Sequence, residues 1–284
     1  MAVTIFLLGL LYVVLGVVLV YAGIRWPVVL VLSAGGLFVQ YWFSDRLALR
    51  AMGGRVVLPQ EAPQLHAVVD RLCALADMPK PKVAIADVDL PNAFATGRSP
   101  KRAVVCATTG LLRRLDAREL EGVLSHELAH VAHRDVAVMT VASFVSVVAG
   151  LLLRSLAWGG YGRRRESNAA AALLMILAVS VAVYALSYLL IRALSRYREL
   201  SADRSGALLT GQPSALASAL VKITGEIGRI PTRDLRQAEA YNAFFFAPAA
   251  AVGFSLSSVF STHPPLEQRL DQLGRISAQL GRAG

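Results

Sequence analysis

Four long stretches without a charged residue constrain this chain more than any other feature of its sequence. A helix needs roughly 20 apolar residues to cross a bilayer. The four stretches that approach or exceed this length are Met1–Ile24, Trp26–Ser44, Val136–Leu153 and Ser167–Ile191. Hydrophobic residues make up 55% of the 284 residues and charged residues only 17%, whereas soluble domains are about 25% charged. The sequence therefore predicts a mainly α integral membrane protein with four transmembrane helices.

Two of the four stretches have a second interpretation. Met1–Ile24 is apolar enough for a cleaved signal peptide, but it lacks the positively charged segment with which such peptides begin. Val136–Leu153 is short for a span and also suits a buried helix of a soluble domain, although it can extend past Arg154 to Trp158. We expect two transmembrane hairpins, residues 1–44 and 136–191.

The polar residues form two portions, 45–135 and 192–284. An even number of predicted spans separates them, so both lie on one side of the membrane. Arginines flank the spans on that side, and an excess of Lys and Arg beside spans marks the cytoplasmic face. Arg163–Arg165, on the opposite side, count against this orientation. We expect a multi-pass protein of the cell (inner) membrane whose polar portions face the cytoplasm.

The net charge of +10 raises the question of a nucleic-acid partner. A basic stripe interleaved with aromatic residues would favour such a partner. Here the positive charge follows the span edges instead. We expect a lipid bilayer and no nucleic acid among the partners.

The first polar portion carries several secondary-structure signals. Pro63 and the helical spacing of apolar residues predict a helix over 63–78. Its expected buried face consists of Leu65, Val68, Leu72 and Leu75. Lys82–Val88 is a predicted strand, and residues 92–96 and 103–108 are expected to form a hairpin around a Gly-Arg-Ser-Pro turn.

The next predicted helix contains an H-E-x-x-H motif. Asp116 is suited to cap this helix, with Glu119 at the third position to complete a capping box. Spacing of four residues places His126 and His130 on one helix face, one turn apart, where two imidazoles can bind one Zn²⁺. Glu127 follows the first histidine and is expected to take a proton from the water that the metal activates.

His133 is a tempting third ligand, because it lies seven residues after His126 on nearly the same face. A helix rises about 1.5 Å per residue, so the two lie about 10 Å apart along the axis. Both cannot join His130 on one tetrahedral ion. We therefore interpret His133 as a residue outside the metal site.

The third ligand is expected from the second polar portion. Glu199 and Asp203 are four residues apart and share one face of a predicted helix. One can bind the metal, while the other can accept the free N–H of a ligand histidine and fix its tautomer. Alternatively, both carboxylates pair with Arg196, Arg198 or Arg204 on a solvated face. Their spacing alone leaves these possibilities open.

The chain resembles the HtpX-type membrane zinc metalloproteases, which are related to the type I CAAX prenyl proteases. The resemblance covers nearly the whole chain, including both pairs of hydrophobic stretches. The motifs that carry it are Pro91–Arg98 (PNAFATGR), Thr108–Leu112 (TTGLL), Ser125–His130 (SHELAH), Arg198–Asp203 (RELSAD) and Ser261–Pro265 (STHPP). The chain departs from the commonest pattern at His133 and in the arginine-rich loop.

This resemblance implies a gluzincin with one Zn²⁺ per chain. It implies that His126, His130 and Glu199 bind the metal, that Glu127 is the catalytic base, and that Asp203 supports a ligand histidine. The two polar portions, residues 45–135 and 192–284, would then form a cytoplasmic zincin-like α+β catalytic domain with a small sheet.

The resemblance also implies the class of reaction and of substrate. The implied function is protein quality control under stress, by cleavage of damaged or misassembled membrane proteins or unfolded proteins. The alternative is a catalytically inactive membrane scaffold or transporter that retains a zinc site.

Substrate and transition-state contacts are expected at two further places. Asn92, Ala93, Phe94 and Ala95 form a possible edge strand that pairs with an extended substrate, or else an internal hairpin strand. His263 precedes two prolines, and it stabilises the oxyanion, gates the zinc, or caps a helix that starts at Pro264. The apolar run Phe244–Phe260 is interpreted as core or as a membrane-grazing segment.

Overall fold

The computed structural model of this chain describes residues 2–21, 27, 31, 34–39, 41–42, 49–50, 52–158, 167–229 and 263–283. The loop predicted at 159–166, the run Phe244–Phe260 and nearly half of the predicted span 26–44 lie outside these residues. The chain forms two compact units. The first consists of Met1–Tyr41 and Ala137–Leu194, and the second of Trp42–Val136 and Ser195–Gly284.

The first unit is helical. It contains α1 (Ala2–Tyr21), most of α6 (Asp135–Trp158) and the first part of the 44-residue helix α7 (Ser167–Thr210). Its hydrophobic core includes Leu8, Leu11, Leu15, Ala142, Val145, Ala149, Val183 and Leu194. Many large apolar side chains of the same helices are exposed, among them Phe6, Val13, Val17, Leu174 and Leu186.

One helical stretch in the described residues, Leu174–Thr210, is long and apolar enough to cross a membrane. The apolar segments Phe6–Val17 of α1 and Asp135–Ser146 of α6 are shorter. The first, third and fourth predicted spans are thus helical over most of their length. The number of membrane crossings stays a prediction.

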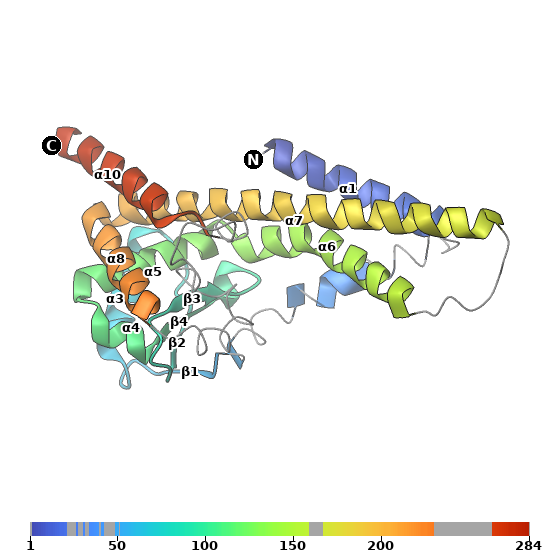
Figure 1. Cartoon of the computed structure of the whole chain (residues 1–284). Helices are drawn as coiled ribbons and strands as arrows, with labels where there is room; N and C mark the ends of the chain where they lie inside the picture. Colours follow the sequence, from blue (N-terminus) through green and yellow to red (C-terminus); the bar gives the residue numbers. More distant parts are fainter. Residues whose placement is uncertain are drawn as a thin grey trace. The chain divides into compact units, whose positions relative to one another are not determined.

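The second unit is built around a four-stranded mixed sheet (Figure 1). Its strands are β1 (Gly54–Val56), β2 (Lys82–Ala86), β3 (Ala93–Thr96) and β4 (Val104–Thr108), in the order β1-β2-β4-β3. Strands β2 and β4 are parallel, whereas the pairs β1–β2 and β3–β4 are antiparallel. The predicted hairpin is confirmed, and β3 lies at an edge of the sheet.

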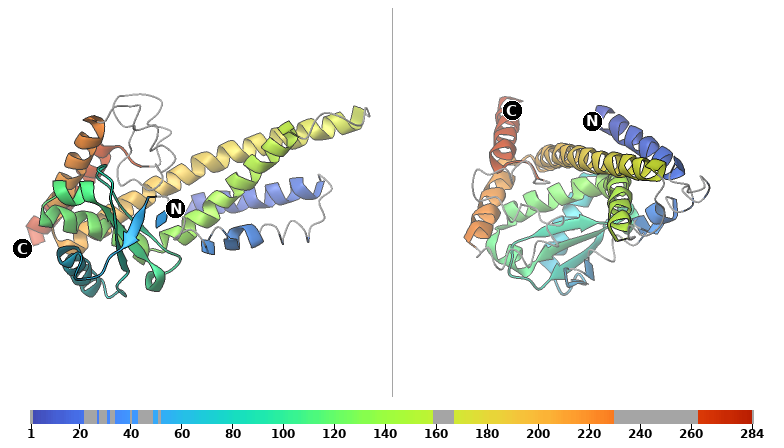
Figure 2. Two further views of the ribbon diagram at one scale, coloured as in Figure 1. Left: turned by 90° about the horizontal axis from the view of Figure 1, so that it is seen from below. Right: turned by 45° about the vertical axis from the view of Figure 1, so that its right-hand side comes forward.

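Three helices pack against this sheet, α3 (Pro63–Leu75), α4 (Thr109–Arg114) and α5 (Ala117–Ala132). Helix α8 (Pro213–Arg229) packs on α5, and α10 (Leu266–Ala283) packs on α8. A short 3₁₀ helix lies at Pro100–Arg102. The green α5 lies beside the teal strands in both views of Figure 2. The chain is therefore mainly helical with a small mixed sheet.

The main core lies between the sheet and these helices. Val105 and Ala107 of β4 meet Leu124 and Leu128 of α5 there. On the other face of the sheet, Phe94 and Cys106 belong to a smaller buried cluster. Because successive strand residues point to opposite faces, β3 and β4 contribute to both layers.

The buried face of α3 differs from the prediction. Leu65 and Leu72 are buried as expected, together with Val69 and Cys73, but Leu75 is 53% exposed. The helix ends at Leu75 rather than at residue 78.

Candidate active site and metal centre

The helix that carries the H-E-x-x-H motif, α5, begins at a capping box. The Asp116 carboxylate accepts hydrogen bonds from the main-chain N–H groups of Arg118 and Glu119, both at 2.9 Å. In return, Glu119 Oε2 accepts from the Asp116 N–H at 3.0 Å. The predicted cap is confirmed. It fixes the start of the helix two and a half turns before the motif.

Small residues let two further helices approach α5 closely. A Cβ atom at Gly122 would lie 3.0 Å from the main-chain nitrogen of Leu216 on α8. A Cβ atom at Gly206 of α7 would lie 2.8 Å from Ser125 Oγ and 2.9 Å from His126 N. The close approach of α7 brings the acidic residues one and two turns before Gly206 to the histidines of α5.

Three side chains converge at this point, as the sequence predicts. The Nε2 atoms of His126 and His130 lie 3.1 Å apart. Glu199 Oε1 lies 3.4 Å from His130 Nε2, and Glu199 Oε2 lies 3.7 Å from His126 Nε2. Zinc bonds of about 2.0–2.1 Å at tetrahedral angles place ligand atoms about 3.3–3.4 Å apart. The three side chains therefore have the spacing of ligands around one ion.

The other ring nitrogens show that this arrangement suits a cation. His126 Nδ1 lies 2.8 Å from Asp203 Oδ1, and His130 Nδ1 lies 2.5 Å from Asp135 Oδ2. If each carboxylate accepts the Nδ1 proton, both Nε2 atoms carry lone pairs, and these lone pairs point at each other. Two facing lone pairs beside a carboxylate repel one another unless a cation lies between them. The donor set of two imidazoles and one carboxylate is one that Zn²⁺ favours.

Asp203 pairs with a buried arginine that no sequence motif indicates. Arg269 of α10 donates from Nε to Asp203 Oδ2 at 2.7 Å and from Nη2 to Oδ1 at 2.6 Å. Burial by itself raises the pKa of Asp203, but Arg269 and His126 outweigh burial and lower this pKa to about 2. The carboxylate is thus held as an anion behind His126. The alternative, a solvated pair with Arg196, Arg198 or Arg204, is wrong for Asp203.

Glu127, the predicted base, is buried near His130 and Glu199. Its Oε2 accepts a hydrogen bond from the main-chain N–H of Ala95 at 2.8 Å. Burial, with the nearby Glu199 carboxylate, raises the pKa of Glu127 to about 7, against the opposing charge of His130. A carboxyl with this pKa is suited to take up and return a proton near neutral pH.

His263 lies against the third predicted ligand. Its Nδ1 lies 2.9 Å from Glu199 Oε2. Burial raises the pKa of Glu199, but His263 and His130 outweigh burial and hold this pKa well below its usual value. The helix after His263 begins at Leu266 rather than at Pro264. A cap on a helix starting at Pro264 is therefore wrong, and a role beside the metal site stays a prediction.

Strand β3 is the element that presents Ala95 to Glu127. Ala93 pairs with Ala107 of β4, and Ala95 pairs with Val105. Because the Ala95 N–H points to Glu127, it faces the open side of this edge strand. Ala93, by contrast, is 1% exposed and packs in the main core. Its small side chain makes room for α5 rather than for a substrate.

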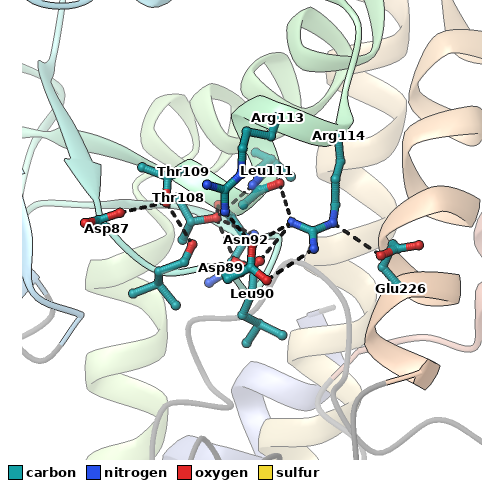
Figure 3. A network of polar contacts seen from close by, with 12 residues as sticks. Asp87, Asp89, Leu90, Asn92, Thr108, Thr109, Leu111, Arg113, Arg114 and Glu226 are labelled. Atoms are coloured by element: carbon teal, nitrogen blue, oxygen red, sulfur yellow. Dashed lines mark hydrogen bonds and ion pairs between the residues drawn. The ribbon is translucent and has the colours of Figure 1, made fainter.

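A network of polar contacts holds the loop before β3 (Figure 3). The buried Thr108 hydroxyl accepts from the main-chain N–H of Asn92 at 2.9 Å and lies 2.8 Å from the carbonyl oxygen of Leu90. Arg113 and Arg114 of α4 both bind the Asp89 carboxylate, and Arg114 also reaches Glu226 of α8 at 3.3 Å. Asn92 is therefore a fixed part of the loop, with its main chain turned toward β4.

His133 lies outside the group of converging side chains. It is the exposed C-cap residue of α5. Burial of part of its ring, together with the charge of His130, lowers the pKa of His133. This position agrees with the prediction that it is not a metal ligand.

Comparisons with known proteins are consistent with this geometry. The sequence profile of Peptidase family M48 matches residues 59–277. The chain belongs to peptidase family M48. It is 62% identical over 284 residues to Protease HtpX homolog 1 of Streptomyces coelicolor, covering 100% of this chain and 93% of that protein. It is 53% identical over 282 residues to Protease HtpX homolog of Moorella thermoacetica, covering 99% of this chain and 94% of the relative.

These relatives confirm the predicted resemblance, so the chain is an HtpX-type membrane metalloprotease of the M48 family. Its fold also resembles the crystal structure of S. mikatae Ste24p, with a TM-score of 0.56 and 16% sequence identity. The match covers 93% of this chain but only 62% of Ste24p. At this identity the likeness concerns the fold alone.

Proposed function

We propose that this M48 protease is a zinc-dependent endopeptidase with one Zn²⁺ bound by His126, His130 and Glu199. The observation that carries the proposal is the pair of Nε2 atoms that face each other at 3.1 Å, each on a ring whose Nδ1 faces a carboxylate. One carboxylate oxygen of Glu199 lies 3.7 Å from His126 Nε2, and the other lies 3.4 Å from His130 Nε2. Three protein ligands leave room for substrate and water, as in catalytic zinc sites.

Zn²⁺ held by His126, His130 and Glu199 would supply a Lewis acid for the scissile carbonyl and for water. Glu127 takes the proton of the attacking water and delivers it to the leaving amine. The N–H of Ala95 holds one oxygen of this carboxylate, so the other can turn toward the water. We propose that His263, which contacts Glu199, stabilises the developing oxyanion.

Damaged or misassembled membrane proteins and unfolded segments are the substrates we propose. A peptide that enters this site must be extended, and β3 is an edge strand with main-chain groups on its open side. Pairing with such an edge gives affinity without strict sequence preference. That property suits the removal of unrelated damaged proteins.

The proposed topology has four membrane spans and a catalytic unit on the cytoplasmic side. The apolar stretch of α7 and the exposed apolar side chains of α1 are consistent with lipid contact. The orientation is based on the arginines beside the predicted spans. The competing function is an inactive membrane scaffold that keeps its zinc.

The variant Glu127→Gln tests the proposal. Glutamine keeps the size of the side chain and its hydrogen bond to Ala95, but it cannot take a proton. We expect one zinc per chain to remain bound and cleavage of casein to fall about 10²-fold or more. Zinc is measured by elemental analysis of the purified full-length protein, and cleavage by release of peptides.

Glu121→Gln is the matched control. Glu121 is a buried glutamate of the same helix, but its carboxylate pairs with Arg71. We expect it to keep both zinc and activity. Loss of zinc in Glu127→Gln, or full activity in that variant when loaded with metal, contradicts the assignment. A wild-type protein that holds zinc but cleaves nothing supports the scaffold.

A further inference from the structure

The second histidine of the motif has a carboxylate partner that the sequence motifs do not indicate. His130 Nδ1 lies 2.5 Å from Oδ2 of Asp135, the first residue of α6. Only two residues, His133 and Arg134, separate α5 from Asp135. Arg134 has a φ of 54° at this break between the helices, and its N–H donates to the carbonyl of Val131 at 3.1 Å. A left-handed residue here turns the next side chain back onto the end of α5.

Asp135 is in turn held by a buried arginine next to a predicted ligand. Arg198 of α7, the residue before Glu199, forms an ion pair with the Asp135 carboxylate. Its Nη1 also donates to the main-chain oxygen of Asp135 at 3.0 Å. Arg198 is 6% exposed and Asp135 is 7% exposed. The guanidinium therefore meets the same residue at two points, away from water.

The same pattern occurs behind the other histidine. Asp203 lies 2.8 Å from His126 Nδ1, and Arg269 binds both oxygens of Asp203. Both ligand histidines thus face a buried aspartate, and both aspartates are paired with a buried arginine.

Electrostatics explains why the arginine and the aspartate must come together. A buried guanidinium beside a cation site repels a divalent ion, since charges interact strongly where water is excluded. The Asp135 carboxylate neutralises Arg198 and at the same time accepts the imidazole proton. Either residue alone would leave an uncompensated charge buried at this position, and burying such a charge is costly.

We propose that Asp135 and Arg198 are positioning residues of the metal centre. Asp135 fixes the tautomer and ring orientation of His130, and Arg198 fixes Asp135 while tying the start of α6 to α7 beside Glu199. This inference rests on the proposed function, in that His130 must be a zinc ligand. Partners of this kind typically change metal affinity by about 10–100-fold.

Zinc affinity, rather than activity, is the measurement that tests the proposal. The full-length protein in detergent is titrated against a competing chelator at a temperature at which the metal-free variant remains folded. Thermal unfolding of the metal-free protein is measured in parallel. We expect Asp135→Asn to weaken zinc binding about 10–100-fold, because the arginine loses its partner and the histidine loses an anionic acceptor.

The double variant Asp135→Asn/Arg198→Met covers the case in which the single variant does not fold. Removing both members of a buried ion pair is far less damaging than removing one. We expect the double variant to recover part of the lost affinity but to stay below the wild type. Asp271→Asn is the control, since it makes the same change in the exposed pair of Asp271 and Arg275 on α10 and should leave zinc affinity unchanged.

The outcomes separate this inference from the proposed function. A wild-type protein that binds no zinc overturns both. If the wild type binds zinc and both the single and the double variant bind it equally tightly, only the positioning role is overturned, even if their metal-free stability falls. In that case the ion pair merely joins two helices.

Discussion

At the scale of single residues, Glu199 and Asp203 show how two identical functional groups take different roles. They are four residues apart on α7, but Glu199 faces the Nε2 atoms of the histidines, whereas Asp203 faces an Nδ1 atom and Arg269. We expect Glu199→Gln to release most of the zinc, because the metal loses a charged ligand. Asp203→Asn should weaken zinc about 10–100-fold. Chelator competition measures both.

The His133→Ala variant is the control for this chelator titration. His133→Ala should keep wild-type zinc affinity, because His133 lies outside the converging group. If Asp203→Asn strips the metal while Glu199→Gln retains it, the roles of the two carboxylates are exchanged.

Residue spacing predicts which residues share a helix face but not which ones meet across helices, and Glu199 is expected beside the histidines only because of the family resemblance. His126, Glu127 and His130 follow from their spacing alone, because a helix fixes which side chains share a face. Arg269 and the N–H of Ala95 belong to elements that only tertiary packing brings to the site. The position of Arg198 gives a weak indication of its role, because a basic residue next to a predicted metal ligand needs a counter-charge.

At the scale of elements, the loop before β3 depends on the absence of a side chain at Gly110. A Cβ atom there would lie 2.0 Å from the carbonyl oxygen of Asp89. Gly110→Ala must therefore displace main chain that Arg113 and Arg114 hold in place, and β3 with it. We expect a loss of stability of about 1–3 kcal/mol and reduced proteolysis. Thermal unfolding and casein cleavage of the full-length protein measure these changes.

Gly274→Ala provides the comparison for this substitution. A Cβ atom at Gly274, in the middle of α10, meets no other atom within 4 Å. Alanine is favoured over glycine inside a helix by about 0.5–1 kcal/mol, so this variant should gain stability. A Gly110→Ala protein as stable and active as wild type would show that the loop adapts freely.

A second element-scale prediction concerns the junction of α5 and α8. The buried Glu119 carboxylate accepts from Ser218 at 2.7 Å and from Lys222 at 2.7 Å. Burial raises the pKa of Glu119, but Lys222, Ser218 and the Asp116 N–H outweigh it, so this pKa lies below its ordinary value. The stabilisation is therefore complete above the unfolded-state pKa of about 4.3 and is lost as pH falls through the lower folded-state value.

We expect Glu119→Gln to lower the unfolding temperature at pH 7 and to remove part of the acid sensitivity that the wild type shows below about pH 4.5. Thermal unfolding between pH 7 and pH 3.5 measures both effects. Glu267→Gln, at an exposed position of α10, should leave the wild-type profile unchanged. An unchanged acid profile in Glu119→Gln would refute the role of this carboxylate.

The elements with local signals were predicted more accurately than those without. The capping box and the proline at the start of α3 are local, and the structure confirms both helix starts. Strand β1 has three residues and exists only because β2 provides a partner, so the sequence alone gave no indication of it. The buried face of α3 shifted toward Val69 and Cys73 because contact with neighbouring helices, rather than periodicity, decides which side is covered.

At the scale of the whole molecule, the order of the site residues along the chain restricts the topology. His126 and His130 precede the second predicted span pair, and Glu199 follows it. Because these three side chains converge, the predicted spans between residues 136 and 191 must be even in number. This argument is independent of charge. Which side it is depends on the arginines beside the spans, and Arg163–Arg165 oppose the others.

Single-cysteine labelling in intact cells decides the orientation. Cys73 and Cys106 are replaced first, although both are buried and burial raises the pKa of each thiol. Tyr161→Cys lies in the predicted external loop, whereas Gln60→Cys and Leu280→Cys replace exposed residues of the catalytic unit. We expect an impermeant maleimide to label position 161 alone in intact cells, and all three positions after permeabilisation. Label at positions 60 and 280 but not at 161 would place the protease outside the cell, because the loop arginines would then have outweighed those beside the spans.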